Sequence, residues 1–112
     1  MKPKGFCYYV YMNPSYVFVA ELWIYHGEGA WHFVTLPEEY APEVKVISQG
    51  WQDKGFGSVK VSVSVEGISW STSLFPDRKS GSYILPVKKE IRSRLNVGAG
   101  DKLSISLRLS DV

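Results

Sequence analysis

The chain has 112 residues, of which 45% are hydrophobic and 21% charged, and its formal net charge is +2. This length suits one globular domain, and the composition is ordinary for a soluble protein. No run of eighteen apolar residues is present, which excludes a membrane-spanning helix, and the tyrosine-rich N-terminus lacks the cleavage pattern of a signal peptide. We therefore expect one cytoplasmic domain over residues 1–112, with residues 1–14 as an extra edge strand or extension.

Cysteine and histidine are scarce. Cys7 is the single cysteine, so it cannot form an internal disulfide, which agrees with a reducing compartment. With His26 and His32 it makes too small a set for a tetrahedral metal site. The sequence therefore predicts neither a metal nor a cofactor.

Period-two patterns dominate the chain from residue 16 onward. Residues 16–25 and 30–36 read as two strands around a loop at 26–29, where glycines favour a turn. Four valines alternate with polar residues in Val59–Val65, Glu66-Gly67 is a hairpin turn, and the next strand runs from Ile68 until Pro76 stops it. Two more strands are expected at 83–85 and 103–109.

Two short helices interrupt these strands, and each is entered through a Leu-Pro pair, at Leu36-Pro37 and Leu85-Pro86. Proline suits the first position of a helix, where its missing N–H costs nothing. Pro42 predicts that the first helix begins as a tight turn and becomes regular from about Pro42 to Ser48. The two units suggest a weak internal repeat. Glycines at 98 and 100 end the second helix, and the glycine-rich stretch 50–57 reads as a connection.

These elements predict a mainly β protein. About six to seven strands on so short a chain indicate a small closed or double-split β-barrel, because closure removes unprotected sheet edges.

Several segments carry a family resemblance. The stretch 84–103, a strand, Pro86, a basic helix and a Gly-Asp turn before the last strand, resembles the half-unit of AbrB-like and MazE-like double-split β-barrels. The longer pattern is similar to a family of small bacterial domains of unknown function, sometimes joined to YdeI/OmpD-associated domains. It is carried by residues 18–23, 30–39, 55–61, 70–76, 80–89 and 98–101. The resemblance implies the barrel fold and no established activity.

Positive charge is concentrated at one place in the sequence. Residues 77–94 contain six basic and two acidic residues, a net charge of +4, so the remainder of the chain sums to −2. Arginines beside hydroxyl groups suit phosphate or carboxylate ligands, although lysine and arginine also simply solvate a surface. The candidate binding residues are Trp70, Ser73, Arg78, Lys79, Tyr83, Lys88, Lys89 and Arg92.

The leading hypothesis is a non-catalytic binding module for an anionic small molecule or a partner protein, acting as a monomer or homodimer. An AbrB-like DNA-binding protein is the alternative, which the low net charge disfavours. An enzyme is the second alternative. The serines at 69, 71 and 73 lack a nucleophile motif, so catalysis would need a displaced pKa at Glu21, Glu38 or Asp53. An exposed Trp51 would favour ligand contact.

Overall fold

The structure, a computed structural model, describes residues 14–27, 29–49 and 57–110. The predictions for residues 1–13, including Cys7, lie outside the described residues, as do those for Trp51 and Asp53. The described part of the chain contains seven strands, two α-helices and one 3-10 turn.

Seven antiparallel strands make one sheet in the order β1-β7-β4-β5-β6-β3-β2. Their order in the sheet pairs segments far apart in sequence, since β1 and β4 both lie beside the C-terminal strand β7. The strands are β1 (Ser15–Glu21), β2 (Trp23–Ile24), β3 (His32–Thr35), β4 (Val59–Val65), β5 (Ile68–Asp77), β6 (Ser82–Pro86) and β7 (Lys102–Leu109).

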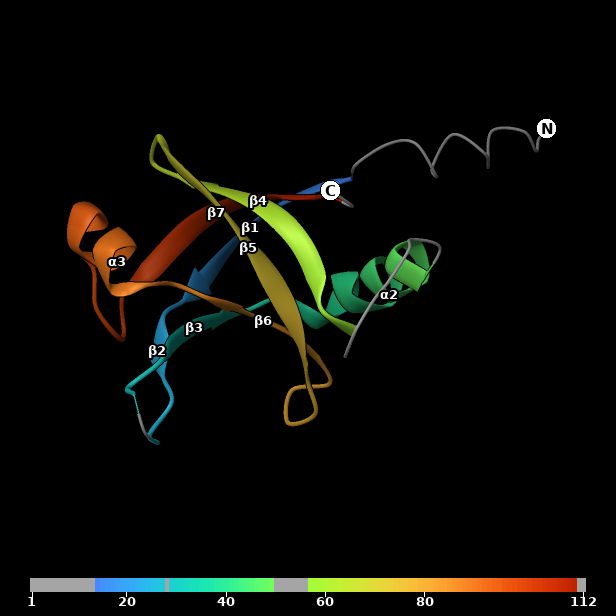
Figure 1. Cartoon of the computed structure of the whole chain (residues 1–112), viewed down its shortest axis with the longest axis horizontal. Helices are drawn as coiled ribbons and strands as arrows, with labels where there is room; N and C mark the ends of the chain where they lie inside the picture. Colours follow the sequence, from blue (N-terminus) through green and yellow to red (C-terminus); the bar gives the residue numbers. More distant parts are fainter. Residues whose placement is uncertain (1–13, 28, 50–56, 111–112) are drawn as a thin grey trace.

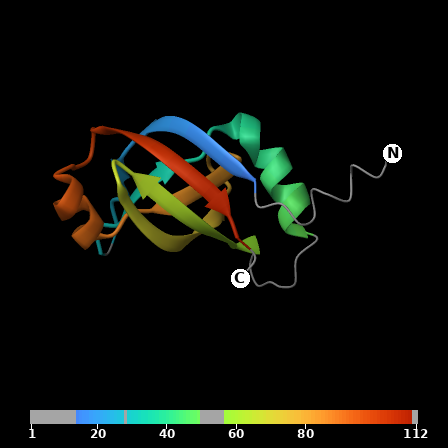
Figure 2. The ribbon, with the colours of Figure 1, turned by 90° about the horizontal axis from the view of Figure 1, so that it is seen from above.

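The sheet curls because its two edge strands follow one another in the chain. Only Leu22 separates β1 from β2, although these strands lie at opposite ends of the sheet order. The Leu22 N–H donates to the carbonyl of Asp101 at 2.9 Å, and its carbonyl accepts from the Gly100 N–H at 2.8 Å. Figure 1 shows the resulting half-barrel, and Figure 2 shows β1, β7 and β4 side by side along one side of it. The predicted mainly β, barrel-like fold is confirmed.

Alternation along the strands fills the inside of the curled sheet. The burial pattern of β7 switches at every residue, and the four valines of β4 are each at most 2% exposed. Successive side chains of a strand point to opposite faces, so each strand gives one apolar row to the core and one polar row to the outside. Leu22, Val34, Leu74 and Leu109 are fully buried in this core.

Two short helices lie at opposite ends of the sheet (Figure 1). A 3-10 turn, η1 (Glu38–Tyr40), leads into α2 (Ala41–Gln49), as Pro42 predicts, and α3 (Lys89–Leu95) follows β6. The expectation of a proline at the first helical position is wrong in both cases. Pro37 has an extended backbone just before η1, and Pro86 is the last residue of β6. Pro86 stays extended because β6 is still paired with β3 there.

The turns agree with the sequence, but one strand end differs. Glu66 and Gly67 both have positive φ, at 47° and 82°, which is the type I′ geometry that matches strand twist. Pro76 does not stop β5, which continues to Asp77. Beyond Leu74 the strand has a neighbour on one side only, β6, and proline is tolerated at such an edge.

Candidate functional site

The outer face of β4, β5, β7 and β1 carries a regular array of small hydroxyl side chains. In β4 and β5, Ser62 lies opposite Ser71 and Ser64 opposite Ser69. Their polar character follows directly from the valine alternation of β4, because the residues between the valines must face outward. The array continues onto β7, where Ser106 lies opposite Ser64.

Arg108 stands in the middle of this array. It lies opposite Ser62 of β4 on one side and opposite Ser15 of β1 on the other. Its side chain is exposed. Since three neighbouring strands fix these positions, the guanidinium has a hydroxyl-bearing residue on each side.

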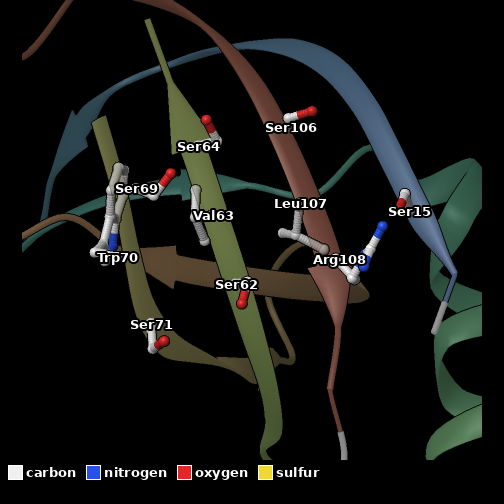
Figure 3. A pocket seen from close by; sticks show the side chains of 10 residues that line it. All are labelled: Ser15, Ser62, Val63, Ser64, Ser69, Trp70, Ser71, Ser106, Leu107 and Arg108. Carbon is white, nitrogen blue, oxygen red and sulfur yellow. The ribbon is translucent and has the colours of Figure 1, made fainter. Parts of the chain in front are cut away.

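This face is hollowed, with a volume of about 490 Å³ (Figure 3). The side chains of Ser62, Ser64, Ser106 and Arg108 stand on the outer side of the strands in that view. The lining residues are Ser15, Ser62, Val63, Ser64, Ser69, Trp70, Ser71, Ser106, Leu107 and Arg108. We call this site the serine hollow.

Trp70 is the one sequence-predicted binding residue that lines the serine hollow. It lies opposite the buried Val63, so its ring faces the inside of the sheet and packs against the core. Its indole N–H is buried and has no hydrogen-bond partner among the described residues. A buried donor of this kind is costly unless something accepts its hydrogen bond.

The basic corner expected from the sequence is divided by the fold. Arg78 and Tyr83 line a hollow of about 700 Å³ beside α2, whereas Lys89 and Arg92 line a separate hollow of about 410 Å³ at α3. The strand β6 runs between these two places, so the basic turn and the basic helix lie at its opposite ends (Figure 1). The expectation that they meet is wrong, because β6 is extended over its whole length.

The remaining predicted residues occupy varied surroundings. Lys79 and Lys88 are exposed. Ser73 is half-buried and lies opposite Lys60. The Arg92 Nε donates to the carbonyl of Val87 at 3.1 Å, which ties α3 to the end of β6. A structural role for Arg92 therefore accompanies any role in binding.

Two tyrosines have displaced pKa values. Burial raises the pKa of Tyr16, and the hydrogen bond that its hydroxyl donates to Glu43 Oε1 at 2.8 Å raises it further. Burial also raises the pKa of Tyr83. Burial disfavours the charged phenolate, so both groups are held neutral and neither is primed as a base.

The histidines lie on the hairpin between β2 and β3. His26 is exposed, and the Nδ1 of His32 is 2.9 Å from the carbonyl oxygen of Ala30. Within residues 14–27, 29–49 and 57–110 no group of three metal-ligating side chains is present.

No helix in this part of the chain is long and apolar enough to span a membrane.

Most of the serine hollow was missed in the sequence. Ser15, Ser62, Ser64, Ser106 and Arg108 are absent from the predicted binding residues, although each faces outward by simple alternation. A signal was available, since β4 and β7 each carry two serines, and β5 three, at alternate positions. The sequence alone does not show the strand order that brings the serine rows of β4, β5 and β7 together.

The fold and this surface define a class of small, single-sheet β-barrel domains with a short helix at each end. Within that class, the chain belongs to the DUF1905 family, a domain of unknown function, whose model matches residues 18–107. No curated protein matches the chain.

Proposed function

We propose that the domain is a non-catalytic binding module that accepts a phosphate or carboxylate group in the serine hollow. The observation that carries this proposal is the position of Arg108, between Ser15 and Ser62 on two neighbouring strands. A planar guanidinium offers paired donors to such groups, and hydroxyls complete the set.

The make-up of the lining supports binding rather than catalysis. Hydroxyl groups and one arginine supply the polar atoms that face the solvent in this hollow. A serine nucleophile needs a positioned general base, and the lining side chains do not include a histidine, lysine or carboxylate.

Rigidity favours the same function. Every lining residue belongs to β1, β4, β5 or β7, and the opposite face of these strands is the packed core. A preorganised surface loses little entropy when it binds, so even a small anion can be held. Only a resemblance in sequence supports the DNA-binding alternative. The same is true of a YdeI/OmpD-type domain as the partner.

The test is an NMR titration of the whole chain with inorganic pyrophosphate, following backbone amides and the Arg108 side chain. We expect saturable shifts confined to the serine hollow, strongest at Ser62, Ser106 and Arg108. The variant Arg108→Gln should weaken binding at least tenfold. Lys102→Gln is the matched control, because Lys102 is a cation on the same face of β7 outside the hollow.

Equal weakening by the two variants would show that binding is diffuse electrostatic attraction. Shifts centred on α3 or on the turn at 78–81 would place the anion site elsewhere. Either result would overturn the assignment of the serine hollow.

A further inference from the structure

A second outer face of the sheet is aromatic. In β2, β3 and β6, Trp23 lies opposite Phe33 and Phe33 opposite Pro86, while Ile84 lies opposite both Thr35 and Phe75. The buried partners on the other side of these strands are Val34 and Leu85, so this row faces outward. We call residues Trp23, Tyr25, Trp31, Phe33, Phe75 and Ile84 the aromatic face.

The rings of this face are held in defined positions. Trp31 stacks on Phe33 with ring centroids 6.2 Å apart and planes 13° from parallel. Trp23 packs on the same Phe33 at 5.2 Å, and its Nε1 donates to Thr35 Oγ1 at 2.9 Å. Trp31 and Tyr25 nevertheless remain 55% and 54% exposed. Large rings that are preorganised and still open to solvent point to a binding surface.

Cations flank the aromatic face at both ends of β6. The Val87 N–H donates to the carbonyl of His32 at 2.9 Å, which extends the β3–β6 ladder by one residue. Lys88 directly follows Val87 and Trp31 directly precedes His32, and both side chains are exposed. At the other end of β6 the turn carries exposed Arg78 and Lys79. In Figure 1 this turn and the β2–β3 hairpin both project from the lower side of the molecule.

Acidic groups close to this face already have neighbours of their own. Asp77 Oδ2 accepts from the Ser80 N–H at 3.0 Å and from the Ser80 hydroxyl at 2.7 Å. Glu21, which precedes Trp23, lies opposite Lys102 in the β1–β7 register. Cations also outnumber anions in this region, because residues 77–90 carry Arg78, Lys79, Lys88 and Lys89 against Asp77 and Glu90, a net charge of +2.

We propose that the aromatic face binds single-stranded nucleic acid, with bases stacked on Trp31 and Tyr25 and phosphates held by Lys88, Arg78 and Lys79. Base stacking on aromatic side chains within a positively charged track is the mode by which β-barrel modules bind single strands. Between Lys79 and Lys88 the extended part is β6 (Ser82–Pro86), whose five residues span roughly 17 Å. This length suits a short site, near the lower limit of about four nucleotides.

This inference does not depend on the serine hollow, which shares only β5 with the aromatic face and uses a different part of that strand. A protein partner or a second copy of the chain could also cover aromatic rings, but neither would need cations at both ends of the face. Charge complementarity therefore favours the nucleic acid.

The experiment measures fluorescence anisotropy of labelled 12-nucleotide dT and U strands and of a 12-base-pair duplex, at low and physiological salt. We expect saturable, salt-sensitive binding of the single strands and weaker binding of the duplex. Trp31→Ala should weaken binding about 5- to 100-fold, and Trp31→Phe should restore part of it. Lys88→Gln should lower the salt dependence by about one released counterion.

Lys60→Gln and Val19→Ser serve as controls on the other outer face, outside the serine hollow, and both should leave strand binding unchanged. NMR spectra of every variant confirm the fold. Absence of strand binding, unchanged binding in Trp31→Ala, or equal affinity for the duplex would each overturn the proposal. Self-association that Trp31→Ala abolishes, without strand binding, would overturn it in favour of a second copy as the occupant.

Discussion

Ser82 donates its hydroxyl to the carbonyl of Leu36 at 2.8 Å, across 46 positions of the sequence. Both residues are buried, so this bond fixes the start of β6 to the chain that leads into α2. We predict that Ser82→Ala lowers the free energy of unfolding by about 1–3 kcal/mol, because the Leu36 carbonyl loses a buried partner. Urea unfolding measures the change. Ser104→Ala, at an exposed strand position, should stay within about 0.5 kcal/mol, and equal losses would contradict the prediction.

The raised pKa of Tyr16 predicts a stability that falls at alkaline pH. Burial and Glu43 favour the neutral hydroxyl in the folded state, so its pKa is higher than in the unfolded chain. The stability that the neutral Tyr16 hydroxyl contributes is therefore fully present below about pH 10. It decreases above this pH, because the unfolded state then binds fewer protons than the folded one. Tyr16→Phe should make this alkaline decrease shallower. Unfolding curves at pH 8 to 11 test this, and an unchanged slope would count against it.

Core valines of β4 should dominate stability. Val63 is 1% exposed, and Val63→Ala is expected to lower the free energy of unfolding by about 1–3 kcal/mol, since it loses apolar burial and leaves a cavity. Ser62→Ala, one position away on the outer face, should change it by less than about 0.5 kcal/mol. Chemical unfolding of these two variants tests directly whether the side chains of β4 alternate between the core and the outer face. Comparable effects would show that the strand faces are assigned wrongly.

A substitution in the turn between β4 and β5 should increase the stability of the protein. Glu66 has φ of 47°, a left-handed conformation that asparagine adopts more readily than glutamate. Glu66→Asn creates the Asn-Gly pair that type I′ turns prefer, and we expect a gain of about 0.5–1 kcal/mol. Thermal unfolding measures it. Gly67→Ala, at φ of 82° with open space around it, should destabilise through backbone strain alone.

Local patterns were sufficient for most of the fold. The valines of β4 and the alternation of β7 each define a strand without reference to the rest of the chain. Pro42 correctly marked the late start of the regular helix α2. The ends of the strands were harder to predict. Pro76 is tolerated within β5 because that part of the strand has a neighbour on one side only, and the sequence does not show this sheet order.

The candidate site could not be predicted in the same way. Arg78, Lys79, Lys88 and Lys89 are close in sequence, but the extended strand β6 holds the two pairs apart. Arg108 is isolated in sequence, yet pairing of β7 with β1 and β4 surrounds it with serines. Sequence proximity predicted a cluster that the fold separates, whereas the observed cluster depends on long-range pairing.

The most direct test of the serine hollow is the affinity for inorganic pyrophosphate, measured by calorimetry for the unchanged chain, Arg108→Gln and Lys102→Gln. Binding weakened at least tenfold by Arg108→Gln and little changed by Lys102→Gln is the result expected of an anion site at Arg108. No measurable binding to the unchanged chain, or equal affinity in the two variants, would contradict it.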